Sequence, residues 1–304
     1  MAAGSVVGSM VSQPANAREL RSNQNGGRLV RTSASVLTFS RYFGEVLEIR
    51  DEMAAIPAGG IALNVTTTNT IDVDGNDSAI PTAASTLYYV CLSNSISATP
   101  LALRLYDAAG PIISSTTSGQ RYLNSTGDGQ YWRIIGQVYT TAAGGLVDTP
   151  ARRLVMNYEN QLPLSLLATP GFTDNNAQTT IAPANVTYAA MNAGTGDLVE
   201  FISDGYAAVY LHLEVVVVAG PAAGVSQYGI GIDTVATAVC ACQVAAAAVN
   251  VCGSTTRCAI LSAGYHAANM ICATGLGATL ACDLVRAGGT ADPIGTQLTG
   301  WVLS

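Results

Sequence analysis

Two histidines, His212 and His266, are the only imidazole groups that can act as a general base in this chain of 304 residues. A serine hydrolase needs such a base beside a nucleophile and an acid that orients it. His212 lies inside an alternating apolar segment, and His266 follows Gly264-Tyr265 where another segment begins. The Gly-x-Ser-x-Gly pattern that presents a nucleophilic serine is absent from the sequence. We therefore predict no catalytic residue and no enzymatic activity.

The cysteines are concentrated late in the chain. Six of the seven lie in one stretch: Cys240, Cys242, Cys252, Cys258, Cys272 and Cys282. Zinc ligands come as Cys-x2–4-Cys pairs, and this spacing does not occur here, so we predict no metal site and no cofactor. Two interpretations stay open: small apolar residues in an alanine-rich core, or disulfides. If disulfides form, Cys252 and Cys258 close the easiest loop, through Gly253-Ser-Thr-Thr-Arg.

An acidic segment, Ile71-Asp-Val-Asp-Gly-Asn-Asp-Ser, has the oxygen-rich composition of a calcium loop. Its carboxylates and amide are Asp72, Asp74, Asn76 and Asp77. The segment departs from the EF-hand template, in which glycine follows the third ligand position and a glutamate closes the loop. Asp-Gly and Asn-Asp also favour tight turns. We therefore favour a polar hairpin loop over a calcium site.

The composition favours a protein that assembles with other chains. The chain is 49% hydrophobic but only 11% charged, against about 25% charged in an average globular protein. So few charges cover a monomer's surface poorly, and contacts between copies explain the deficit. We predict a homotrimer. The net charge of -7 and the lack of a basic run disfavour nucleic-acid binding. No stretch has the pattern of a membrane span or a secretory signal, which predicts synthesis in the cytoplasm.

Residues 1–35 are polar, rich in Gly, Ser and Asn, and poorly periodic. They are typical of an extended arm that becomes ordered on binding. All 13 basic residues of the chain are arginine. The candidates for contact with an acidic protein surface in the arm are Arg18, Arg21, Arg28 and Arg31. The alternative is a solvated tail.

Short alternating segments separated by Gly, Pro, Asn and Asp turns follow the arm, which predicts antiparallel strands. We predict a mainly β fold with two sandwich- or jelly-roll-like domains, at 36–160 and 188–304. Four turn signals between 161 and 187 predict a linker. Residues 206–218 predict a strand that contains His212 and Glu214. Residues 235–251 fit either one helix or strands.

Several of these segments carry a resemblance. In the first domain the segment is Ile56-Pro-Ala-Gly-Gly-Ile; in the second they are Gly231-Ile-Asp, Leu261-Ser-Ala-Gly-Tyr-His and Gln297-Leu-Thr-Gly-Trp-Val. Together with the strand order they resemble virion structural proteins of tailed bacteriophages, of the capsid-decoration (cement or head-fibre) and fibre types. The resemblance implies a virion protein assembled in the host cytoplasm, with the major capsid protein or other virion proteins as partners.

Within this class we favour a decoration protein, because no heptad shaft or collagen-like repeat is present to space a fibre tip from the tail. The alternative is a short tail fibre or receptor-binding protein that recognises a host-surface glycan. Tyrosine and tryptophan suit both protein interfaces and glycan stacking, although core packing is the commoner role. The candidate aromatic residues of the second domain are Tyr206, Tyr228, Tyr265 and Trp301.

Overall fold

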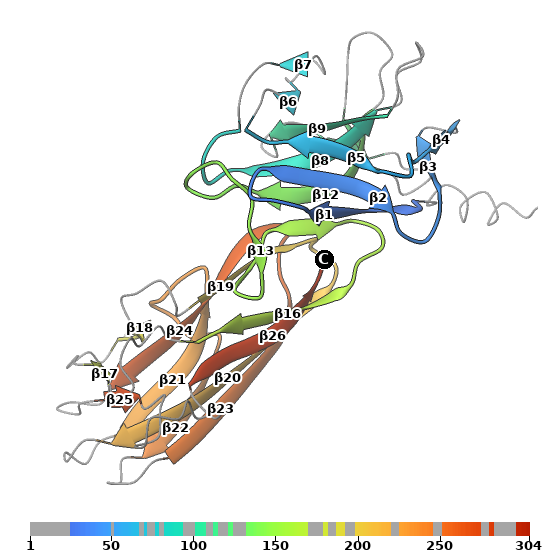
Figure 1. Cartoon of the computed structure of the whole chain (residues 1–304). Helices are drawn as coiled ribbons and strands as arrows, with labels where there is room; N and C mark the ends of the chain where they lie inside the picture. Colours follow the sequence, from blue (N-terminus) through green and yellow to red (C-terminus); the bar gives the residue numbers. More distant parts are fainter. Residues whose placement is uncertain are drawn as a thin grey trace, which may run out of the picture. The chain divides into compact units, whose positions relative to one another are not determined.

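The computed structural model is mainly β, and most of its strand pairs are antiparallel, as the alternating sequence pattern predicts (Figure 1). It describes residues 25–49, 52–66, 70–71, 77–78, 82–93, 101–107, 112–114, 121–123, 132–169, 179–181, 187–191, 198–219, 225–245, 251–274, 280–282 and 296–304. The chain forms two compact units. Unit 1 contains residues 1–82 and 88–136, and unit 2 contains residues 83–87 and 137–304.

Unit 1 contains a three-stranded sheet, β1-β2-β5, a two-stranded sheet, β3-β4, and most of a larger sheet in the order β10-β11-β12-β8-β9-β6-β7. Its core comes from alternate residues of these strands, such as Leu37 and Phe39 of β2 and Leu103 and Leu105 of β9. Its strands are β1 Gly27–Arg31, β2 Val36–Arg41, β3 Val46–Ile49, β4 Glu52–Ala55, β5 Ile61–Asn64, β6 Thr70–Ile71, β7 Asp77–Ser78, β8 Leu87–Ser93, β9 Ala102–Asp107, β10 Ile112–Ser114, β11 Arg121–Leu123 and β12 Trp132–Tyr139. The first residue of β8 and the last three of β12 are assigned to unit 2.

Unit 2 is a sandwich of two sheets. The first, called the β24 sheet, has the order β13-β14-β19-β24-β21-β22, and β18 pairs with β24. The second, called the β20 sheet, has the order β16-β26-β20-β25-β17, and β23 pairs with β20. The strands after β12 are β13 Asp148–Thr149, β14 Arg152–Arg153, β15 Val155–Asn157, β16 Pro163–Ala168, β17 Thr179–Ile181, β18 Ala189–Ala190, β19 Leu198–Ser203, β20 Ala208–Ala219, β21 Val225–Ile232, β22 Cys240–Ala245, β23 Val251–Ile260, β24 Gly264–Thr274, β25 Leu280–Cys282 and β26 Gln297–Leu303.

The core of unit 2 lies between these two sheets. The β20 sheet contributes residues of alternating position, including Leu211 and Leu213, and the β24 sheet contributes Phe201 and Met270 opposite them. Each is less than 2% exposed. Burial of one such side chain contributes about 1.5–3 kcal/mol. Because side chains alternate between the two faces of a strand, this core also determines which residues face outward from each sheet.

The domain boundaries differ from those predicted. Residues 137–160 belong to unit 2 because their partners are there: Arg152 of β14 pairs in parallel with Glu200 of β19, and Tyr139 N–H donates to Leu154 O. Residues 83–87 join unit 2 in the same way, since Thr140 Oγ1 accepts from Thr86 N–H at 3.0 Å. The first part of the predicted linker is strand β16, which pairs with β26 over six residues.

The arm prediction also needs correction. Its C-terminal part is β1, which pairs antiparallel with β2 over five residues and buries Leu29. Arg28 and Arg31 therefore lie on a strand, and the Arg28 guanidinium lies 5.8 Å from the centre of the Tyr42 ring. The short alternation of this segment went unrecognised because Gly and Asn precede it. Arg18 and Arg21 lie outside the described residues.

Two further expectations concern local structure. The strands β6 and β7 pair antiparallel, Ile71 with Asp77, so the predicted hairpin is confirmed, while Asp72, Asp74 and Asn76 lie outside the described residues. Within residues 235–251, the described part contains strand β22 and the start of β23, so the strand alternative holds there. The described residues contain no helix that is long and apolar enough to cross a bilayer.

Candidate functional site

The two outward faces of the unit 2 sandwich hold the residues that the sequence singled out. On the β24 sheet, Glu200 of β19 and Tyr265 of β24 lie on the outer face, because Phe201 and His266 beside them point inward. Tyr265 Oη donates to Glu200 Oε1 at 2.6 Å, and Arg152 of β14 forms an ion pair with the same carboxylate. The Tyr265 ring stacks on Tyr139 with 4.1 Å between the ring centres. This network holds both Tyr265 and Glu200 in place.

The pKa of Tyr265 follows from this environment. Burial raises the pKa of its hydroxyl above the ordinary value, and the hydrogen bond to the Glu200 carboxylate raises it further. The carboxylate accepts a hydrogen bond from the phenol and repels a phenolate. Tyr265 is therefore a structural hydrogen-bond donor at neutral pH.

Both ring nitrogens of His266 form hydrogen bonds within the protein. Nδ1 lies 2.7 Å from Asp233 Oδ2, and Nε2 lies 2.8 Å from the Ser262 carbonyl oxygen. A carbonyl oxygen only accepts, so Nε2 is the donor in the hydrogen bond to Ser262 O. A catalytic histidine needs one ring nitrogen facing the nucleophile. His266 has neither nitrogen free for this role, and it is 6% exposed.

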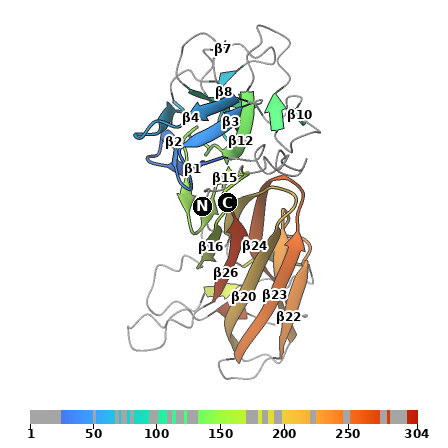
Figure 2. The ribbon, with the colours of Figure 1, turned by 90° about the vertical axis from the view of Figure 1, so that its right-hand side faces the viewer.

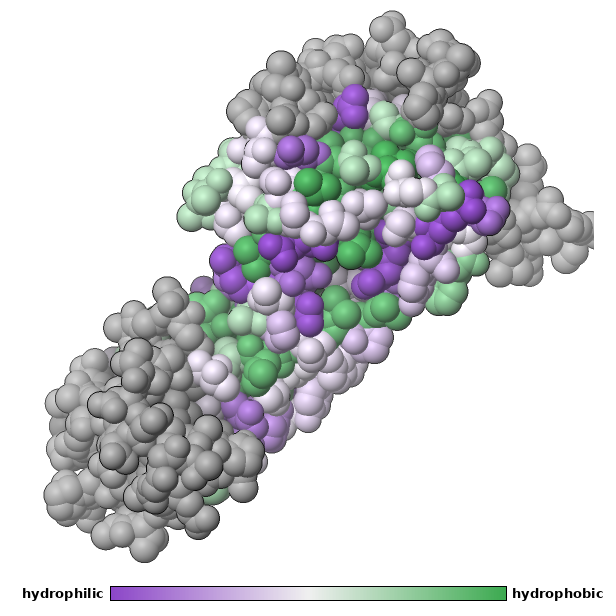
Figure 3. Space-filling model, in the orientation of Figure 1, coloured by the Kyte–Doolittle hydropathy of each residue, from purple (hydrophilic) through white to green (hydrophobic). Residues whose placement is uncertain are grey.

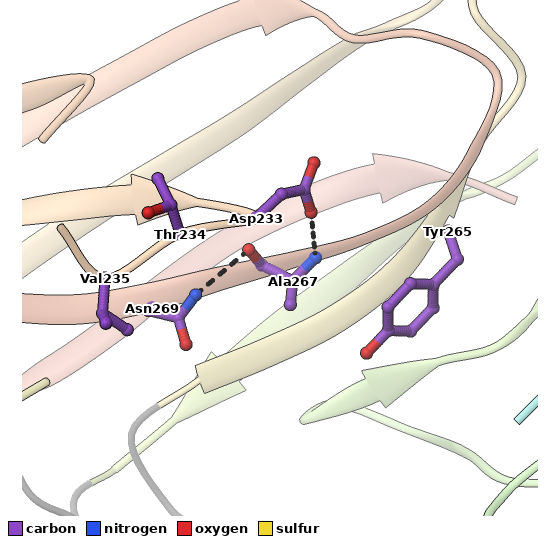
Figure 4. Close-up of a pocket in the computed structure, with 6 residues that line it drawn as sticks. All are labelled: Asp233, Thr234, Val235, Tyr265, Ala267 and Asn269. Carbon is purple, nitrogen blue, oxygen red and sulfur yellow. Dashed lines mark hydrogen bonds between the residues drawn. The ribbon is translucent and has the colours of Figure 1, made fainter. Parts of the chain in front are cut away.

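A shallow hollow lies beside Asp233, between the β21–β22 loop and the outer face of β24 (Figure 4). Its volume is about 560 Å³, and it is lined by Asp233, Thr234, Val235, Tyr265, Ala267 and Asn269. Asp233 has a positive φ of 57° and accepts from Ala267 N–H at 2.9 Å through Oδ1. Both carboxylate oxygens of Asp233 are therefore engaged within the protein.

Glycine in β21 lets this loop lie on the sheet. A Cβ atom on Gly231 would be 2.2 Å from Thr234 O, and one on Gly229 would be 2.7 Å from Cys240 O. Real Cβ atoms do not approach a carbonyl oxygen so closely. The outer face of the β24 sheet is thus covered, in part, by the chain's own loop.

The outer face of the β20 sheet has a different composition. We call it the β20 outer face and define it by the outward residues of four adjacent strands: Ser165 and Leu167 of β16, Thr299 and Trp301 of β26, Tyr210, His212 and Glu214 of β20, and Cys252, Ser254, Thr256, Cys258 and Ile260 of β23. Figure 2 shows β26, β20 and β23 side by side. Glu214 is the single carboxylate in this set.

Aromatic and apolar groups on this face are accessible. Trp301 is 39% exposed and stacks on Tyr210 with 6.2 Å between ring centres, and Ile260 is 64% exposed. Leu167 is 40% exposed on the other side of Trp301. In Figure 3, pale and hydrophobic residues occupy much of the described surface of unit 2 in that view, with hydrophilic residues in smaller groups. Exposed apolar groups around a tryptophan are typical of a protein-binding surface.

His212 belongs to this face and has one polar contact. Its Nδ1 lies 2.9 Å from Thr256 Oγ1 of β23. In a catalytic triad the partner that orients the imidazole is a carboxylate, and here the partner is a threonine hydroxyl. Across the described residues, no group of three or more His, Cys, Asp or Glu residues is placed to hold a metal ion.

The four aromatic candidates do not form one site. Tyr228 is fully buried in the core, and Tyr265 is used by Glu200 and Tyr139. Tyr206 is 74% exposed on the β19–β20 turn, and Trp301 is on the β20 outer face. The Tyr228 prediction fails because alternation alone does not tell which face of an isolated strand is covered.

The sequence pattern does not predict the Arg152–Glu200–Tyr265 network, because its members are far apart in sequence.

The structure also distinguishes the two interpretations of the cysteines, core residues and disulfides. Cys252 and Cys258 are both exposed free thiols on one extended strand, six residues and therefore about 20 Å apart. A disulfide needs Cα atoms within about 7 Å, so the predicted loop does not close. Cys272 and Cys91 are buried, as the core interpretation expects. Burial raises the pKa of the Cys91 thiol and that of the Cys242 thiol, which lowers their reactivity.

Comparison with known proteins gives no family. No family model and no curated protein matches the chain. Among solved structures, the crystal structure of a Bacillus thuringiensis Cry1Da tryptic core variant aligns with 87% of this chain and 47% of that chain, at 8% sequence identity and a TM-score of 0.22. The chain thus spans less than half the length of that protein. A likeness at this level carries no argument about fold or function.

Proposed function

We propose that the chain is a non-enzymatic structural protein of a tailed-phage virion. It decorates the capsid as a homotrimer and attaches through its N-terminal residues, which include Arg18 and Arg21. The resemblance of Ile56-Pro-Ala-Gly-Gly-Ile and Gln297-Leu-Thr-Gly-Trp-Val to such proteins supports this class. Its partners in this role are copies of itself and the major capsid protein, in a virion assembled in the host cytoplasm.

The observation that carries the proposal is the β20 outer face. It is four strands wide, carries one carboxylate, and exposes Trp301 and Ile260. A sheet face with an exposed tryptophan and few charges fits contact with another protein surface better than contact with water. The low overall charge of 11% agrees with this use.

The trimer is tested by light scattering of the purified protein, which should give about three times 31.1 kDa or a multiple of that trimer mass. A Trp301→Glu substitution should dissociate it, because a carboxylate inside a dry contact is costly to bury. Tyr206→Glu is the matched control, since Tyr206 is also exposed but lies on a turn outside the face. A wild-type monomer at micromolar concentration contradicts the trimer.

The site on the virion is tested by gel densitometry of purified particles. A decoration protein is expected in dozens to hundreds of copies, and a tail-tip protein in about a dozen or fewer. A low count, together with free protein that blocks host adsorption, reverses the assignment in favour of receptor binding.

The receptor-binding alternative has one observation of its own. The hollow beside Asp233 and Asn269 has a volume of about 560 Å³, within the range of small-molecule sites. Against it, Asp233 and Tyr265 already use their polar atoms inside the protein. A glycan array with wild type and Asn269→Ala tests it: binding that is lost in the variant supports a glycan site at this hollow.

A further inference from the structure

Strand β23 is a long edge strand of the β20 sheet. It pairs with β20 over ten consecutive residues without interruption, from Val251 to Ile260. Among the described residues, β20 is its only hydrogen-bonding partner, and β22 of the other sheet lies near β23 without pairing with it. Both of its faces are accessible: Ser254, Thr256 and Cys258 are exposed on one, and Arg257 is exposed on the other.

Backbone geometry shows which groups of β23 point outward. Val216 N–H of β20 donates to Thr296 Oγ1 at 3.1 Å, and Thr299 Oγ1 donates to His212 O. The even-numbered residues of β20 therefore direct their backbone toward β26, and the odd-numbered ones direct theirs toward β23. Even-numbered residues of β20 oppose even-numbered residues of β23. The backbone N–H and C=O groups that point away from β20 are those of Cys252, Ser254, Thr256 and Cys258.

This edge has little of the protection that edge strands normally carry. Proteins block such edges with proline, charged side chains, bulges or very short strands. β23 is ten residues long, contains neither proline nor lysine, and has Arg257 as its one charged residue. A weakly protected edge of this length is a template for another strand.

We propose that the β23 edge binds the β23 edge of a second copy of this chain in an antiparallel pair with twofold symmetry. Facing residues must share one face of the continuous sheet, so even-numbered residues oppose even-numbered ones. Two registers then pair nine residues of each strand, 251–259 centred on Thr255 or 252–260 centred on Thr256. The register centred on Thr255 supplies about eight backbone hydrogen bonds between the copies.

Charge selects between the two registers. Centred on Thr255, Arg257 faces Gly253 of the partner, and the two Arg257 side chains start about 14 Å apart. Centred on Thr256, they start about 7 Å apart as diagonal neighbours, where like charges repel. The first register also places each Cys252 opposite Cys258 of the partner. The contact does not rest on the trimer, which needs a threefold contact; it would join one trimer to the next.

The test uses the two exposed cysteines as reporters. A short bismaleimide should cross-link the wild-type protein into a dimer through Cys252 of one copy and Cys258 of the other. Within one chain they are about 20 Å apart, too far for the reagent. Trypsin cleaves after Arg257, between the two cysteines, so mass spectrometry of the linked peptides identifies the pair.

Single substitutions make the test specific. Cys252→Ser alone and Cys258→Ser alone should not cross-link at this strand, because equal cysteines are about 20 Å apart in the register centred on Thr255. A mixture of the two variants should cross-link. Absence of a linked pair in both wild type and mixture, or a linked pair in either variant alone, overturns the proposal.

A backbone substitution tests the edge itself. In Ser254→Pro the lost N–H is one that points away from β20, so β20–β23 pairing is retained. The yield of cross-linked dimer should fall about tenfold or more. Ser254→Thr keeps the N–H and should behave as wild type. If Ser254→Pro does not fold, the mixing experiment decides alone. Retained cross-linking in folded Ser254→Pro overturns the edge contact, and light scattering of the same sample tests the trimer separately.

Discussion

The two sheets of unit 2 share one core but differ on their outward faces. We call the outer face of the β24 sheet the closed face, because groups of the same chain occupy it. Arg152, Glu200 and Tyr265 form a hydrogen-bonded network there, and the β21–β22 loop lies against Gly229 and Gly231. We call the β20 outer face the open face, because it includes the exposed residues of edge strand β23 and the exposed Trp301. A face whose polar groups are satisfied internally serves stability, whereas a face with open backbone groups and apolar side chains remains available to a partner.

Among substitutions on the closed face, Gly231→Ala should cause the largest loss of stability. The new methyl group would lie 2.2 Å from Thr234 O, so the loop or the strand must move. We expect a loss of about 2–3 kcal/mol in the free energy of unfolding, measured by denaturant titration. Cys258→Ala on the open face is the control and should change it by less than about 0.5 kcal/mol. Equal effects would remove the distinction between the faces.

The second largest loss of stability should come from disrupting the Arg152–Glu200–Tyr265 network. Glu200→Ala leaves the Arg152 guanidinium and the Tyr265 hydroxyl without their shared acceptor, and Glu200 is only 14% exposed. We expect a loss of about 2 kcal/mol in the free energy of unfolding. The matched control is Glu214→Ala on the β20 outer face, where the carboxylate accepts from Gln297 Nε2 at 3.1 Å and from no other side chain of the described residues. A larger effect at Glu214 would contradict the assignment.

Alkaline pH should weaken the closed face through Tyr265. Its folded pKa is raised by burial and by Glu200, whereas an unfolded tyrosine ionises near pH 10. The stabilising contribution is therefore complete below about pH 10 and is lost as the pH rises further. Thermal melts from pH 8 to 11 should show a steeper decline for wild type than for Tyr265→Phe. Parallel curves would show that Tyr265 does not cause the decline.

The open face should give the smallest stability effect. Thr256→Val removes the hydrogen bond to His212 Nδ1 but keeps a β-branched side chain on an exposed strand. We expect a change of less than about 0.5 kcal/mol in the free energy of unfolding by thermal or denaturant titration. His212→Ala should be similarly mild. A loss above 2 kcal/mol in either would show that this face contributes to the fold as the β24 face does.

Sequence alone determined the local elements of this protein. The alternation at residues 206–218 predicted β20, and turn residues at 74–76 predicted the β6–β7 hairpin. Period-two patterns depend only on neighbouring residues, so one sequence is enough to predict strands and a mainly β class. The low charge also predicted assembly, which remains a proposal.

Tertiary structure alone decided which face of each strand is covered and which strand lies at an edge. Tyr228 and Trp301 occur in similar alternating segments, yet Tyr228 is buried between the sheets and Trp301 is 39% exposed. Cys252 and Cys258 look like the ends of a short loop, but pairing with β20 holds them apart on one strand. Sheet order comes from pairing between residues distant in sequence, which local patterns do not encode. The open edge of β23 is visible only once that order is known.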